Sequence, residues 1–158
     1  MPINEAQSVV SYLARLKTMA DEYMAISIPD WAERTKAKDD KANEMGLYAL
    51  SHQVSSSDLF QYIQDHPPIH EGLVLAMATL ININPNPDDL QRLLQLGPKV
   101  SRLHVQYRVL LAIVSLQKKG YLSENNKPAV IDLVKLYRVK ADASLLRQID
   151  YTLSFLNA

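Results

Sequence analysis

Two histidines and a glutamate stand close together in the middle of the chain, at His66, His70 and Glu71. On a continuous helix, histidines four residues apart lie on one face and can hold a zinc ion. Here Pro67 and Pro68 lie between them, and proline interrupts a helix. We therefore expect no metal site, but two surface histidines around a turn between helices.

The other residue patterns that carry chemistry are missing or explained by structure. There is no cysteine, which excludes disulfides, thiolate metal sites and thiol nucleophiles. The four glycines form no phosphate-binding loop, and no GxSxG elbow is present. The acid pairs Asp39-Asp40 and Asp88-Asp89 would point about 100° apart on a helix, so neither pair makes a two-carboxylate site. We therefore expect that the protein is not an enzyme and binds no cofactor. The alternative is an enzyme whose site is assembled from separate helices around His104.

Size and composition indicate one folded domain. The chain has 158 residues, of which 47% are apolar, enough for a buried core. The longest apolar stretch is about 11 residues, well below the roughly 20 that cross a bilayer. The first ten residues lack the pattern of a secretory signal, so we expect a cytoplasmic protein without membrane contact.

A short helical segment followed by a longer, more apolar one recurs three times. The longer segments are Leu73–Leu80, Val109–Leu116 and Ile149–Leu156. The shorter segments are Asp58–Gln64, Asp89–Gln95 and Asp132–Arg138. Recurrence of this kind is typical of a helical solenoid, a fold that usually presents a binding surface.

Hydrophobic periodicity and helix-end signals predict an all-α fold with about eight helices. The expected helices cover residues 4–25, 29–53 in one or two pieces, 57–65, 68–82, 87–96, 99–119, 128–138 and 142–158. The polar stretch 34–41 leaves open whether the second helix is broken. The buried faces are expected to include Trp31 in the second helix and Leu146 in the last.

Particular residues are expected to begin or end these helices. Asn4, with Gln7 in capping-box position, is the expected cap of the first helix, Asn86 that of the fifth and Asp142 that of the last. Gly97 and Gly120 are expected to end helices in the left-handed conformation.

This layout resembles the HEAT and armadillo-like helical repeats. The resemblance implies antiparallel helix pairs stacked as a short right-handed α-solenoid in a single domain, residues 1–158. Residues 57–158 would form three helix-pair repeats, and residues 1–55 a divergent first pair. A plain helical bundle is the alternative.

The predicted binding surface is a polar stripe on the inner helices. A helix that is apolar nearly all round, with one polar edge, suits the inner layer of a solenoid. Arginine and tyrosine are favoured anchors in protein interfaces. The predicted partner-binding residues are Glu71, His104, Arg108, Ser115, Arg147 and Tyr151.

The formal net charge of zero hides an acidic and a basic part. Residues 1–91 hold 13 acidic and 6 basic side chains, and residues 92–158 hold 4 acidic and 11 basic ones. We therefore predict a non-catalytic protein-binding module, an adaptor, assembly subunit or toxin-neutralising immunity protein, steered by charge to its partner. Nucleic-acid binding through the basic part is the alternative, and head-to-tail oligomerisation remains open.

Overall fold

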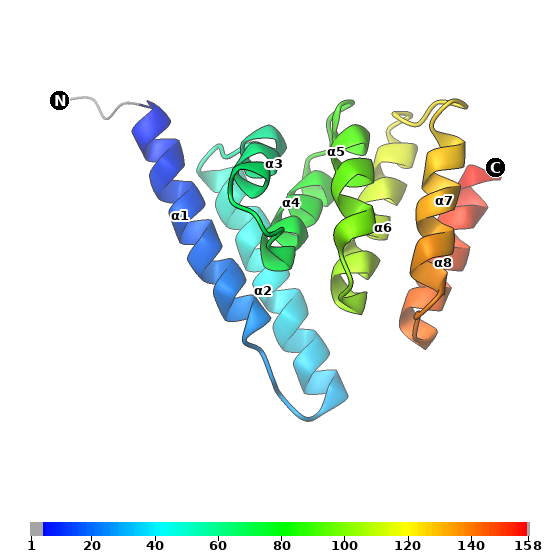
Figure 1. Ribbon diagram of the computed structural model, residues 1–158, viewed down its shortest axis with the longest axis horizontal. Coiled ribbons are helices and arrows are strands. Elements are labelled where there is room, and N and C mark those ends of the chain that lie inside the picture. Colours follow the sequence, from blue (N-terminus) through cyan, green and yellow to red (C-terminus); the bar gives the residue numbers. More distant parts are fainter. Residues whose placement is uncertain (1–4, 158) are drawn as a thin grey trace. The chain divides into compact units, whose positions relative to one another are not determined.

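The computed structural model describes residues 5–157, with side chains from Ser8 onward, and these residues form eight α-helices and one 3-10 helix. No strand forms among them, which confirms the all-α prediction. The helices appear in Figure 1. They are α1 (Glu5–Met24), α2 (Trp31–Ser51), α3 (Ser56–Asp65), α4 (Glu71–Ile83), α5 (Asp89–Leu96), α6 (Leu103–Lys118), α7 (Lys127–Arg138) and α8 (Ala143–Leu156), with the 3-10 helix η1 (Gly97–Lys99) after α5.

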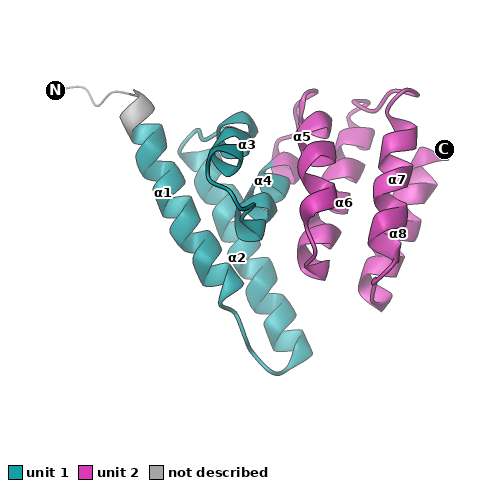
Figure 2. Ribbon diagram, viewed as in Figure 1, with its two compact units in different colours: residues 1–80 teal, residues 81–158 magenta. Residues whose placement is uncertain are grey.

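The internal contacts divide the chain into two compact units, residues 1–80 and residues 81–158 (Figure 2). The division falls within α4, between Leu80 and Ile81. We call these unit 1 and unit 2. The expected single domain of three helix-pair repeats stays a prediction.

Unit 1 is built on α1 and α2, which run antiparallel and pack together along their lengths (Figure 1). Helix α1 buries Leu13, Leu16, Ala20 and Tyr23, which are spaced along one side of the helix. The short helix α3 also packs on α1. The expected capping box of Asn4 and Gln7 lies outside the described residues and side chains.

The second helix is continuous through its polar middle, which settles the point left open by the sequence. It begins at Trp31 rather than at Pro29, because the Asp30 carboxylate accepts the Glu33 backbone N–H at 2.9 Å and caps the helix. Trp31 was expected in the core and is 57% exposed. It stands in the first turn, about three turns before the first buried residue of this helix, Ala42.

The turn between α3 and α4 follows from the two prolines. Helix α3 begins with a capping box of Ser55 and Asp58, and it ends at Asp65, before a cis bond between Pro67 and Pro68. Helix α4 therefore begins at Glu71 and not at residue 68 as expected. Its residues from 72 to 81 are all buried.

The start of α5 reverses the expected capping. Asn86 was predicted to cap this helix, but the Asp89 carboxylate accepts the Asn86 backbone N–H at 2.9 Å. The same side chain is fully buried and pairs with Arg92 at 2.8 Å. A buried carboxylate needs hydrogen-bond donors and a cation around it. Asp89 finds both here, and these contacts join the connector to the helix.

Gly97 does not end α5 in the left-handed conformation. Its φ is −51°, and the chain continues into η1, so that α6 begins at Leu103 and not at residue 99. A Cβ atom at Gly97 would lie 3.1 Å from the Tyr137 hydroxyl oxygen and 3.1 Å from a Leu133 methyl carbon. A side chain here would press against α7, so the close packing of α7 favours glycine. Gly120, with φ +77°, is left-handed as predicted.

In unit 2 the longer helices α6 and α8 make the most extensive packing, and the shorter helices α5 and α7 also touch one another. Helix α5 packs on α6, and α7 packs on α8. The Asp142 carboxylate caps α8 through the Leu145 N–H at 2.8 Å, as predicted. Leu146 was expected in the buried face of α8 but is 37% exposed.

Candidate interaction surface

The six predicted partner-binding residues fall into different environments. Glu71 is half-buried at the start of α4 in unit 1. In unit 2, His104 and Ser115 are half-buried and Arg108 is only 8% exposed. Arg147 and Tyr151 are exposed on α8. The structure therefore leaves two of the six on an open surface.

The predicted polar stripe of α6 is largely used inside the protein. Arg108 is enclosed, and the Ser115 hydroxyl donates a hydrogen bond to the Asn82 side-chain oxygen. On α8, Gln148 is buried too, and Thr152 donates to its backbone oxygen at 2.8 Å. A buried polar group that already has a partner inside the fold offers little to a ligand.

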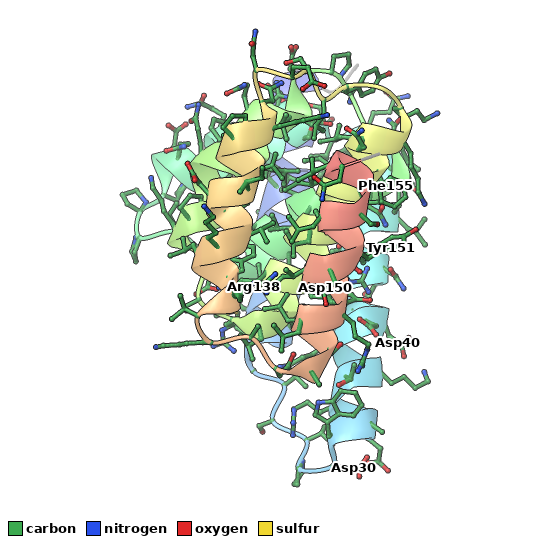
Figure 3. All side chains as sticks on the ribbon, turned by 90° about the vertical axis from the view of Figure 1, so that its right-hand side faces the viewer. Asp30, Asp40, Arg138, Asp150, Tyr151 and Phe155 are labelled. Carbon is green, nitrogen blue, oxygen red and sulfur yellow. The ribbon has the colours of Figure 1, made fainter. Side chains whose placement is uncertain are left out.

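The exposed face of α8 gathers aromatic and cationic side chains. Tyr151 is 45% exposed, and its ring meets the Phe155 ring edge-on with centroids 4.9 Å apart. The Lys118 ammonium of α6 lies 5.5 Å from the Phe155 ring centroid. Tyr151 and Phe155 lie one turn apart along the same side of α8 (Figure 3). We call Lys118, Arg147, Tyr151 and Phe155 the α8 face.

Unit 2 carries an excess of positive charge. Residues 81–158 include 11 basic and 6 acidic side chains, a formal net charge of +5. Arg138 of α7 and Asp150 of α8 stand across from each other at 3.7 Å (Figure 3). This pair is exposed and contributes little to stability. The surrounding field favours a partner with negative charge.

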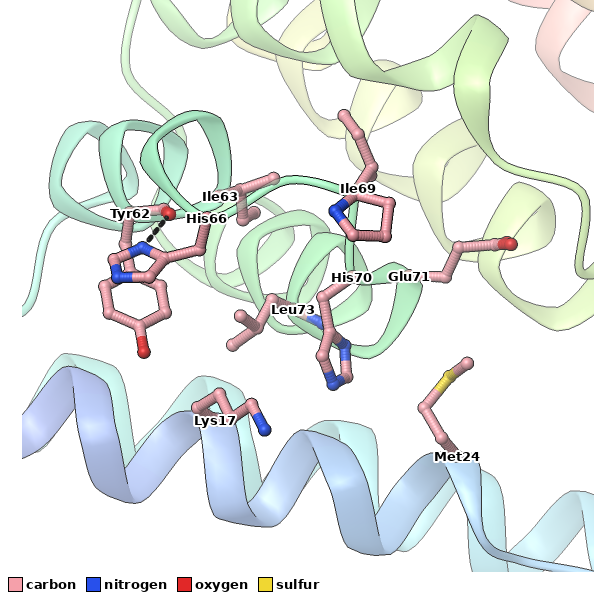
Figure 4. A pocket seen from close by; sticks show the side chains of 10 residues that line it. Lys17, Met24, Tyr62, Ile63, His66, Ile69, His70, Glu71 and Leu73 are labelled. Atoms are coloured by element: carbon pink, nitrogen blue, oxygen red, sulfur yellow. Dashed lines mark hydrogen bonds between the residues drawn. The ribbon is translucent and has the colours of Figure 1, made fainter.

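Unit 1 holds a pocket of about 400 Å³ between α1, α3 and the start of α4. Figure 4 shows the stacked pair Tyr62 and His66 on one side and His70 above α1. The floor is apolar and includes Ile63 and Leu73. Glu71 is the one predicted partner-binding residue that lines it.

The pocket histidines serve structural roles. The His66 Nδ1–H donates to the Tyr62 backbone oxygen at 2.8 Å (Figure 4), and the rings stack 4.1 Å apart. His70 Nδ1 accepts the Leu73 N–H at 3.3 Å, so its Nε2–H donates to the Asp21 carboxylate at 2.7 Å. His70 thus caps α4 and ties it to α1.

Asp21 is the electrostatic centre of this contact. It also accepts a hydrogen bond from the Lys17 ammonium at 2.7 Å. The hydrogen bond from Lys17 and the one from His70 lower the pKa of the Asp21 carboxyl below its usual value. Among the residues that the structure describes, no group of three or more His, Asp or Glu side chains is placed to hold a metal ion.

Comparison with known proteins adds no relative to this picture. No protein-family model matches the chain, and neither the curated proteins nor the solved structures include a match. Within the described residues, no helix combines the length and the apolar character needed to cross a membrane.

Proposed function

We propose that this protein is a non-catalytic protein-binding module, and that an acidic protein partner contacts the α8 face of unit 2. The observation that carries the proposal is the exposed Tyr151 beside Phe155, Lys118 and Arg147. Such a cluster combines large contact area with directed polar groups, as the energetically dominant residues of interfaces do. Because unit 2 carries a formal net charge of +5, we expect the partner to bind through a negatively charged surface.

We further propose that the helix pairs are the repeats of a short right-handed α-solenoid of the HEAT type. The packing within unit 2 supports this, since α5 pairs with α6, α7 pairs with α8, long helix meets long helix and short meets short. Two layers of this kind are what stacked helix pairs produce. A solenoid is a scaffold for surface contacts, in keeping with a binding role.

The test is a double variant, Arg147→Glu with Tyr151→Ala. Proteins captured from lysate of the native host by the wild-type chain and by the variant are compared by mass spectrometry, and the partner that differs is purified and titrated. We expect at least about a tenfold loss of affinity, equal to about 1.4 kcal/mol. Circular dichroism should show unchanged helicity, because both side chains are exposed.

A control variant on unit 1, Arg15→Glu with Leu47→Ala, makes the same charge change and also removes exposed apolar area. It should bind the partner as the wild type does. Equal affinity of the α8 variant and the wild type would refute the proposal. If the wild-type chain instead bound an oligonucleotide, with an affinity that falls steeply as salt is added, the nucleic-acid alternative would be favoured.

A further inference from the structure

A second feature of unit 2 lies away from the predicted stripe, where the end of α7 meets η1 and the loop that follows it. A groove of about 250 Å³ opens there. It is lined by Pro98, Val100, Ser101, Gln106, Leu136, Tyr137, Val139 and Lys140. None of these residues belongs to the α8 face.

Apolar side chains stand open to solvent at this groove. Leu136 is 49% exposed and Val139 is 77% exposed, although both are large aliphatic residues. They lie three residues apart at the end of α7, and the buried Tyr137 lines the same groove. Covering exposed aliphatic surface yields about 25 cal/mol per Å², so a ligand that covers both would gain from this contact.

The groove also contains a buried hydrogen-bond acceptor without a donor. Gln106 is 8% exposed, and its Nε2–H donates to the Val100 backbone oxygen at 3.0 Å. That bond fixes the orientation of the amide and leaves Oε1 as the acceptor. No described group donates to Oε1, which is enclosed.

The charge at the groove is positive. Lys140 is one of the lining residues, and no acidic side chain is among them. Lys99 ends η1, directly between the lining residues Pro98 and Val100. A ligand with a carboxylate next to an apolar group would therefore meet a cation at the rim.

We propose that this groove binds an extended protein segment in which an apolar side chain adjoins an acidic one. The apolar side chain covers Leu136 and Val139, and the carboxylate pairs with Lys140. Gln106 lines the groove beside the bound segment, so its side-chain amide reports binding. This inference rests on the proposed function for the expectation that the ligand is a protein, and it assigns a second contact outside the α8 face.

The experiment is a titration of the isotope-labelled full-length chain with a short capped peptide of alternating leucine and aspartate, followed by NMR. We expect saturable shifts of the Gln106 side-chain amide and of the Leu136 and Val139 methyl groups, with a dissociation constant of about 1 mM or below. Two matched peptides serve as controls, one with lysine replacing aspartate and one with serine replacing leucine. Both should bind at least about tenfold more weakly.

Two variants locate the site. Lys140→Glu and Val139→Ser both change exposed side chains and should each weaken peptide binding severalfold. The α8 double variant should bind the peptide as the wild type does. Absence of shifts at the groove, shifts confined to the α8 face, or equal binding of the lysine peptide would overturn the proposal. These outcomes differ from failure of the proposed function, which is measured with the whole partner and the α8 variant.

Discussion

Removing the hydroxyl of Tyr137 tests how α7 is held against η1. This hydroxyl is buried and donates to the Gly97 backbone oxygen at 2.7 Å. In Tyr137→Phe the carbonyl keeps one weaker donor, the Val100 N–H at 3.3 Å. An acceptor that loses its partner costs about 1–3 kcal/mol. Because Gly97 keeps its second donor, we expect a loss near the lower limit, about 1 kcal/mol.

The assay is thermal unfolding followed by circular dichroism. The size of the shift in melting temperature depends on how cooperatively the chain unfolds. A loss of about 1 kcal/mol lowers the melting temperature by roughly 4–8 °C in a domain of 60–100 residues, and by roughly 2–4 °C in one of 150–250. The larger shift, in one of two resolved transitions, would mean that unit 2 melts by itself. The smaller shift in a single transition would mean that both units melt together.

Tyr107→Phe is the matched control. Tyr107 lies on α6 in the same unit, is half-buried, and its hydroxyl has no hydrogen-bond partner among the described residues. Its removal should change stability by less than about 0.5 kcal/mol. If Tyr137→Phe proved as neutral as the control, the hydrogen bond to Gly97 would not hold α7 in place, and the reasoning would be refuted.

Two further predictions concern the contact between α1 and α4. A Cβ atom at Gly72 would lie 2.7 Å from the Ala20 backbone oxygen. Because the two backbones must then separate, Gly72→Ala should lower the free energy of unfolding by about 1–3 kcal/mol, measured in urea. Equal or greater stability of the variant would contradict this. The hydrogen bonds from Lys17 and His70 lower the folded-state pKa of Asp21 below its usual value of 3.8. The stabilisation is therefore complete above pH 3.8 and is lost as pH falls through the lower folded-state value. Asp21→Asn should accordingly be less stable than the wild type at pH 6, and the difference should shrink toward pH 2; a constant difference would rule out this ionisation as its source.

Local signals in the sequence predicted most helix ends, because these depend on residues close together in the chain. Asp142 and Gly120 act as predicted, since a cap and a left-handed glycine need only neighbouring backbone groups. Gly97 does not, because its role is set by Tyr137 and Leu133, which are some 40 residues away. No pattern within α5 could reveal that contact.

The candidate surface was predicted only in part for a similar reason. Periodicity identified the polar side of α6, but it could not show that Arg108 is enclosed. Arg147 and Tyr151 were found because helical periodicity places them on the arc of α8 that lies away from its apolar face. The groove at the end of α7 was missed, although Leu136 and Val139 depart from the buried face of that helix and could have signalled it.

The position of Trp31 has a practical consequence. It is the single tryptophan in the chain, and it stands mostly in solvent at the beginning of α2. Its emission in the native protein should already resemble that of a hydrated indole, so it would change little when the core melts. A shift of that emission to shorter wavelength, or protection from a soluble quencher, would instead report anything that covers the α1–α2 turn, which gives a built-in optical probe for ligands of unit 1.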